Sequence, residues 1–96
     1  MAELRCQSAL CQKSLWLPVL TELRRRAARW RQTAEVTRAE TVTLRLVGAM
    51  TWRGESADVF RRVLARRVGE LRELAEREDA VAAMLDRLAA VVEQAA

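Results

Sequence analysis

Two long stripes of apolar and small residues, separated by a short break, constrain the fold of this chain more than any other feature. The first stripe begins at Trp16 and the second at Ala57, and in both the steps alternate between three and four residues. This alternation is the heptad spacing of helices that pack side by side. Gly54 lies in the break and can adopt the positive φ that a chain reversal requires. The sequence therefore predicts an all-α fold, an antiparallel hairpin of two helices.

The members of the stripes define the predicted contact surface. The first stripe comprises Trp16, Leu20, Leu23, Ala27, Trp30, Ala34, Thr37, Thr41, Leu44 and Gly48; the second comprises Ala57, Phe60, Leu64, Arg67, Leu71, Leu74, Glu78, Val81, Leu85, Leu88, Val92 and Ala95. Neighbouring apolar side chains such as Val63, Val68, Ala75, Ala82, Met84 and Val91 widen the second stripe. A band this wide indicates contact with more than one helix.

The predicted boundaries follow from local signals. Residues 1–17 lack clear periodicity and are interpreted as a leader of uncertain order, followed by the hairpin over residues 18–96. Pro18 suits the first turn of a helix, where its missing N–H has no partner to lose. We expect the first helix over about 18–49, the turn over 50–55 and the second helix over about 56–94. Either Ser56 or Gly54 is the expected N-cap.

One segment supports a second interpretation. Residues 41–47 are rich in β-branched side chains and alternate apolar with polar residues, which is typical of a strand. A single strand has no sheet to join, and the heptad stripe continues through the segment. We therefore predict helix here.

The small size of the chain favours a partner. With 96 residues it forms one domain, and two helices side by side leave their outer apolar edges exposed to water. A second hairpin covers those edges and completes a four-helix bundle, so we predict a dimer. The residues expected in the dimer or hairpin interface are Leu20, Leu23, Trp30, Leu44, Phe60, Leu64, Leu71, Leu74, Leu85 and Leu88. Whether each serves the hairpin core or the dimer is left open by the sequence.

The composition argues against catalysis. There is no His, no glycine-rich phosphate loop and no cluster of metal ligands, so we expect no enzyme activity, cofactor, metal or small-molecule substrate. Cys6 and Cys11 are five residues apart, which places them on different faces of a helix. They are either free thiols or partners in a disulfide.

Charge is distributed unevenly along the chain. Residues 1–54 carry ten basic and four acidic side chains, a difference of +6, whereas residues 55–96 carry seven basic and nine acidic ones, a difference of −2. This asymmetry favours antiparallel packing of the two halves or an acidic partner. Arginines 24–26, 29 and 31 around Trp30 support a second hypothesis, a basic helical protein that binds nucleic acid. Acidic residues scattered through the second half argue against nucleic acid, and competition with dimerisation argues against membrane association.

The segment from Trp52 to Phe60, with Gly54 at its break, resembles the WXG family of small helical hairpins of type VII (ESX) secretion systems. Ala57 and Phe60 match the small and aromatic residues that follow the Trp-x-Gly turn in that family. The resemblance covers about residues 18–96 and also rests on chain length, the central position of the turn and the paired heptads. It implies a dimerising hairpin that is exported without a signal peptide, from the cytoplasm to the cell surface or medium. The Ala- and Arg-rich composition fits an actinobacterial source.

The resemblance also raises two questions about the parts of the chain. Trp52 either covers the end of the hairpin or is recognised by the secretion machinery, as the turn is in the family. Family partners that carry the export signal have a Tyr-x-x-x-Asp/Glu motif after the second helix, and this chain contains no Tyr. It therefore either leaves as the passenger of a signal-bearing WXG partner, which favours a heterodimer over a homodimer, or it lacks a tail.

Overall fold

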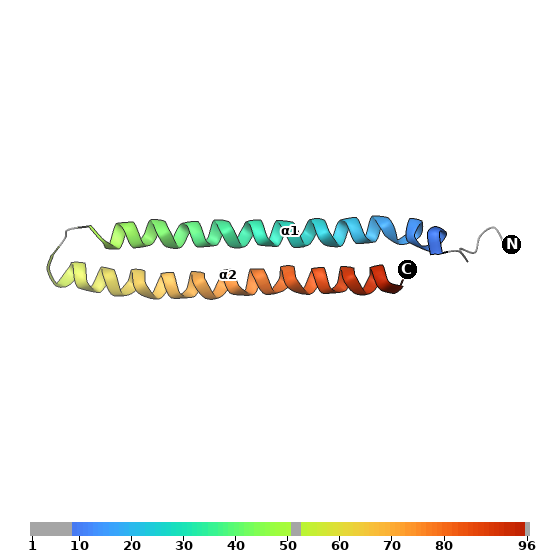
Figure 1. The fold of residues 1–96 in the computed structure, drawn as a ribbon. Helices are drawn as coiled ribbons and strands as arrows, with labels where there is room; N and C mark the ends of the chain where they lie inside the picture. Colours follow the sequence, from blue (N-terminus) through green and yellow to red (C-terminus); the bar gives the residue numbers. More distant parts are fainter. Residues whose placement is uncertain (1–8, 51–52, 96) are drawn as a thin grey trace.

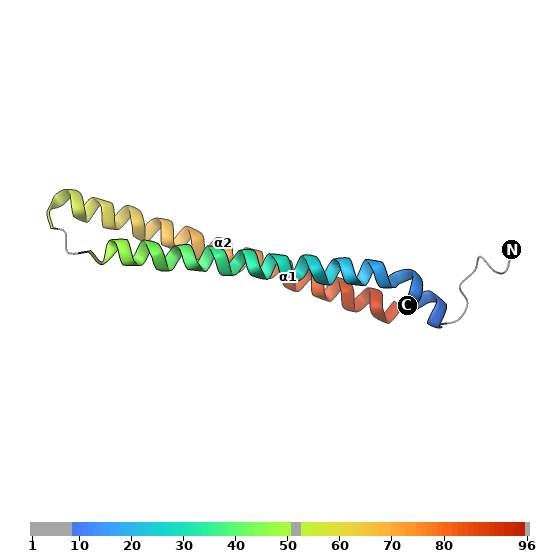
Figure 2. The ribbon, with the colours of Figure 1, turned by 90° about the horizontal axis from the view of Figure 1, so that it is seen from above.

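Two long helices lie side by side along almost their whole length. The computed structural model describes residues 9–50 and 53–95, with side chains from residue 15 onward. Helix α1 spans Ala9–Gly48 and helix α2 spans Glu55–Ala95. They run antiparallel and form a thin rod with principal extents of 79 × 16 × 14 Å (Figures 1 and 2). The prediction of an all-helical hairpin is confirmed.

The segment 41–47 is helical, so the strand interpretation is set aside. Its threonine side chains hydrogen-bond to the preceding turn of their own helix. The hydroxyl of Thr41 donates to the carbonyl of Arg38 at 2.6 Å, and that of Thr43 donates to the carbonyl of Ala39 at 3.3 Å. Such bonds occupy the hydroxyl groups within the helix. Thr41 is also buried against α2, which gives the helical form a packing contribution that an isolated strand lacks.

The first helix begins at Ala9, earlier than the predicted start at Pro18, which lies inside the helix. A proline in a helix interior removes one backbone hydrogen bond and costs about 3 kcal/mol. The residues on its N-terminal side include Ala, Leu, Gln and Lys, all good helix formers. Figure 2 shows the first, dark blue turns of α1 bending away from the axis of the rest, as expected for a helix that continues past a proline.

The core of the hairpin is a seam of mostly small side chains. On α1 the buried residues are Leu20, Ala27, Ala34, Thr37 and Thr41, all members of the predicted first stripe. On α2 they are Ala57, Val68, Leu71, Ala75, Glu78, Ala82 and Ala89. All six of these alanines, Ala27, Ala34, Ala57, Ala75, Ala82 and Ala89, are at most 1% exposed. Small side chains on both surfaces allow the two backbones to approach closely and fill the space between them.

The second stripe differs from the prediction at every other position. Leu71 is buried as expected, and Glu78, a charged break in the apolar stripe, is buried as well. Leu74, however, is 44% exposed, and its neighbour Ala75 is buried instead. The same shift by one residue replaces Arg67, Val81 and Leu88 by Val68, Ala82 and Ala89 as the buried members. The α2 sequence satisfies heptad spacing along both lines, and the line of smaller residues is the one that faces the alanines of α1.

The turn is organised around Gly54, which has a φ of +116°. Its carbonyl accepts the first hydrogen bond of α2, from the N–H of Asp58 at 3.1 Å, so Gly54 rather than Ser56 precedes the helix as N-cap. Glu55 and Asp58 lie in the first turn, where negative charge is favourable to the helix dipole. The predicted turn residue Trp52 lies outside the described residues.

We expect Gly54→Ala to destabilise the hairpin by about 1–3 kcal/mol, because a Cβ at this φ strains the backbone even though no atom lies within 4 Å of its position. The matched control is Gly69→Ala. Gly69 is inside α2 and also has an open Cβ position, so the alanine should stabilise by about 1 kcal/mol through helix propensity. Thermal unfolding followed by circular dichroism at one protein concentration checks both. Equal effects of the two substitutions would show that the turn does not require glycine.

Candidate functional site

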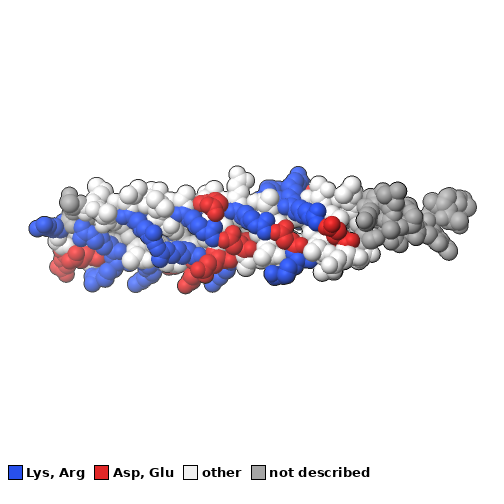
Figure 3. All heavy atoms as spheres, in the orientation of Figure 1, with Lys and Arg blue, Asp and Glu red and all other residues white. Residues whose placement is uncertain are grey.

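A ladder of three ion pairs joins the helices along one edge of the seam. The ion pairs are Arg24 with Glu93, Arg31 with Asp86, and Arg38 with Asp79. Each step is seven residues forward on α1 and seven residues back on α2, so the rungs follow the heptads of an antiparallel pair. Figure 3 shows basic and acidic groups alternating along the line between the helices in the half away from the turn. We call these three pairs the heptad ladder; all three form in the observed register of the hairpin.

Each rung is exposed to solvent and therefore contributes little free energy by itself. The side chains of Arg31 and Asp86 are 52% and 40% exposed. Exposed pairs of this kind are worth about 0.2–1 kcal/mol. The hydrogen bond with Asp79 raises the pKa of the Arg38 guanidinium, which stays charged throughout the working range of pH. The ladder therefore supports the alignment of the helices only weakly.

A polar contact inside the seam supports the same register. The Thr37 hydroxyl lies 2.7 Å from Oε1 of Glu78, and both residues are buried. A slip of either helix would leave the Glu78 carboxylate without this partner, and an unpaired buried polar group costs about 1–3 kcal/mol or more. Polar residues in an otherwise apolar seam commonly specify register.

The edge opposite the ladder is apolar. Leu74, Val81, Met84, Leu88 and Val91 recur on α2 with heptad-like steps, and we call them the outer stripe. Four of them are 44–62% exposed, and Val81 is half-buried. At 100° per residue these positions lie on the side of α2 away from Asp79 and Asp86. The hairpin therefore presents one charged edge and one apolar edge.

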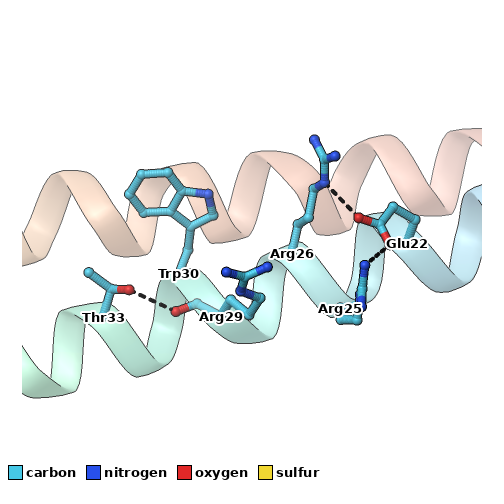
Figure 4. Close-up of a pocket in the computed structure, with 6 residues that line it drawn as sticks. All are labelled: Glu22, Arg25, Arg26, Arg29, Trp30 and Thr33. Carbon is cyan, nitrogen blue, oxygen red and sulfur yellow. Dashed lines mark hydrogen bonds and ion pairs between the residues drawn. The ribbon is translucent and has the colours of Figure 1, made fainter.

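A shallow hollow of about 550 Å³ lies on α1 around Trp30 (Figure 4). Glu22 pairs there with Arg26 at 2.9 Å and with Arg25 at 2.5 Å. The hydrogen bond from Arg26, followed by that from Arg25, lowers the pKa of the Glu22 carboxyl. The stabilisation from this lowered pKa is present above the unfolded-state value and is lost as the pH falls through the folded-state value. Because all these groups are exposed, the arrangement is a screened surface cluster.

The residues predicted for the interface divide into two groups. Leu20 and Leu71 are buried in the seam, while Leu23, Leu44, Leu64 and Leu85 are half-buried along it. Trp30, Phe60, Leu74 and Leu88 are 38–48% exposed. The hairpin thus brings the first group together between α1 and α2. Leu74 and Leu88 belong to the outer stripe.

Sequence reasoning missed the role of Arg61. Its Nε donates to the carbonyl of Gly48 at 3.2 Å, and its Nη2 donates to the carbonyl of Met50 at 3.1 Å. These contacts satisfy carbonyls at the C-terminal end of α1, which have no partner within their own helix. The available signal was its heptad position, four residues after Ala57 and three before Leu64. Arg61 therefore links the C-terminal end of α1 to the start of α2.

Two other kinds of site are absent from the described part of the chain. No group of three or more His, Cys, Asp or Glu residues there could hold a metal ion. None of the described helical segments is long and apolar enough to cross a membrane. The pairing of Cys6 and Cys11 lies outside the described side chains.

We expect Arg61→Ala to destabilise the hairpin by about 1–2 kcal/mol, because it removes hydrogen bonds from a charged donor to the end of α1. The control is Arg62→Ala, which removes the same charge from the exposed neighbouring position and should change stability by less than about 0.5 kcal/mol. Urea unfolding at a single protein concentration measures both. Equal losses of stability in the two variants would contradict the role of Arg61 in linking the two helices.

Comparison with protein-family models, with curated proteins and with solved structures found no match for this chain. The described fold is a two-helix hairpin with a small-residue seam. The likeness to the WXG family consequently remains a prediction from the sequence.

Proposed function

We propose that this protein is a WXG-like pairing module, a helical hairpin that binds a second hairpin to form a four-helix bundle. The outer stripe is the observation that carries this proposal. Leu74, Met84, Leu88 and Val91 expose 44–62% of their surface along one edge of α2. An ordered apolar edge on so thin a molecule is typical of a protein-binding face.

Export by, or membership of, a type VII secretion system is the second part of the proposal. It is supported by the Trp-x-Gly resemblance together with a hairpin whose two helices meet at Gly54. The protein would act without catalysis, as a homodimer or as a heterodimer with a related WXG hairpin. It would reside in the cytoplasm before export.

The alternative of nucleic-acid binding has less support. The arginine cluster around Trp30 is largely engaged by carboxylates, because Arg24 and Arg31 pair with α2 and Glu22 holds Arg25 and Arg26. Phosphate binding would have to displace these pairs. A dense, uncompensated basic face is the usual electrostatic footprint of a nucleic-acid-binding surface.

We expect the double variant Leu74→Glu/Leu88→Glu to abolish pairing while the hairpin stays helical, because both side chains already reach solvent and glutamate would place charge in the covered face. The matched control is Val42→Glu/Leu46→Glu, whose targets on α1 are 55% and 68% exposed. Sedimentation velocity at micromolar concentration measures pairing. It is applied to the protein expressed alone and to the protein co-expressed with a related WXG hairpin. Dissociation by the control but not by the outer-stripe variant would contradict the assigned face. A wild-type chain that is monomeric under both conditions would contradict pairing.

Export predicts that the protein accumulates in the culture medium of its source organism and remains in the cells when the type VII system is inactivated. Immunoblotting of the two fractions checks this, with a cytoplasmic enzyme as the lysis control. Equal amounts in the medium with and without the secretion system would refute export by this route.

A further inference from the structure

At the next level toward the turn, which we call the fourth rung, the heptad ladder has no carboxylate. One heptad beyond Arg38 on α1 is Arg45, and one heptad before Asp79 on α2 is Arg72. The three preceding rungs each pair an arginine with a carboxylate, whereas this one places two arginines at matching levels. Neither Arg45 nor Arg72 makes an ion pair or side-chain hydrogen bond with the described part of the chain. Figure 3 shows basic groups along the line between the helices in the half nearer the turn.

Both arginines line one hollow of about 320 Å³ between the helices. The other residues around it are Leu44, Gly48, Arg61, Leu64, Ala65 and Val68. Gly48 leaves space here. A Cβ at its position would fill part of that space and lie 3.5 Å from Cδ1 of Leu64, an ordinary contact distance. The hollow therefore combines apolar side chains with the guanidinium groups of Arg45 from α1 and Arg72 from α2; the third arginine, Arg61, donates to the carbonyls of Gly48 and Met50.

Two guanidinium groups at one level repel each other, and neither is paired with a carboxylate in the described part of the chain. A carboxylate placed between them would accept charge-assisted hydrogen bonds from both, and such bonds are about twice as strong as neutral ones. The planar donor fork of arginine suits this bridging geometry. The fourth rung is thus complementary to one additional negative charge.

We propose that the hollow between Arg45 and Arg72 is the docking site for a glutamate or aspartate side chain on an amphipathic helix of an acidic protein. The hollow lies on the ladder edge, opposite the outer stripe, so this helix is separate from the hairpin that is proposed to pair there. The net charge of +4 disfavours a second copy of this chain as the occupant and favours an acidic protein. The hollow is also lined by Leu44, Leu64 and Val68. These apolar side chains favour a carboxylate flanked by apolar side chains over a free anion such as phosphate.

The first experiment tests whether the fourth rung is electrostatically coupled within the hairpin. Arg72→Asp should complete the ladder with Arg45 and raise the Tm of the isolated protein by about 1–5 °C. In an Arg45→Gln background the same substitution should lose this gain, and the comparison cancels its effects on other neighbours. An equal change in Tm in both backgrounds would overturn the assignment of Arg45 and Arg72 to one rung.

The second experiment tests the carboxylate preference with a fluorescein-labelled, three-heptad amphipathic peptide that carries either Glu or Gln at one central position beside its leucine stripe. By fluorescence anisotropy, the Glu peptide should bind the wild type about tenfold more tightly than the Gln peptide, the effect of about 1.4 kcal/mol. Arg45→Gln/Arg72→Gln should abolish the preference. The control Arg62→Gln/Arg66→Gln has the same net charge and alters two exposed arginines of α2, so it should retain the preference.

A preference for Glu that survives in Arg45→Gln/Arg72→Gln, or that is lost equally in the control, would overturn the proposal in favour of general charge attraction. Competition of inorganic phosphate with the Glu peptide at equal concentration would overturn the assigned occupant. Failure of the proposed function can be distinguished from failure of this inference. The first would appear as a lack of pairing through the outer stripe. The second would appear as equal binding of the Glu and Gln peptides.

Discussion

The close approach of small side chains between α1 and α2 is the constraint on which the rest of the structure depends. Ala27 and Ala34 are completely buried, and on α2 Ala75, Ala82 and Ala89 are at most 1% exposed. Packing of this kind brings the helix axes together and leaves no room between them for a row of large side chains. The leucines and the methionine of the outer stripe therefore remain at the edge. The apolar edge is a consequence of how the hairpin closes.

The same close packing explains why polar interactions set the register. Alanine against alanine differs little from one heptad to the next, so the small-residue seam alone would tolerate a slip of seven residues. The Thr37–Glu78 contact is lost in either slip by one heptad. A slip that moves Arg38 opposite Arg72 also loses a rung, whereas the slip that moves Arg38 opposite Asp86 would pair Arg31 with Glu93 and Arg45 with Asp79 and keep three rungs. The buried contact therefore distinguishes the register, and the weak surface pairs support it.

Most of the fold could be predicted from the sequence, because heptad spacing and a central glycine are local signals. The first stripe was placed correctly at Leu20, Ala27, Ala34, Thr37 and Thr41, although its member Trp30 is 40% exposed. Residues 41–47 are helical as predicted. The second stripe was ambiguous, since Leu74 and Ala75 each continue a valid heptad line through Leu71 and Glu78. The choice depends on the size of the residues opposite, and that information becomes available only when the two helices are aligned.

Two further features depend on tertiary structure in a similar way. Pro18 is a local signal for a helix start, but α1 extends to Ala9 because the preceding residues favour helix strongly enough to include it. Arg61 looks like one basic residue among several in sequence, and its role appears only when the end of α1 lies beside the start of α2. The same holds for Arg45 and Arg72, which are far apart in sequence and line one hollow once the helices lie side by side.

The distribution of these interactions has a consequence for stability. The hairpin places its small residues inside and several of its large apolar residues outside, so the buried area per residue is modest and much of the hydrophobic free energy is left for a partner to recover. A second hairpin on the outer stripe would stabilise the folded state by mass action, because it binds only the aligned helices. The polar contacts that fix the alignment therefore serve pairing as well as folding, since a slipped hairpin would present Leu74 and Leu88 at the wrong level to its partner.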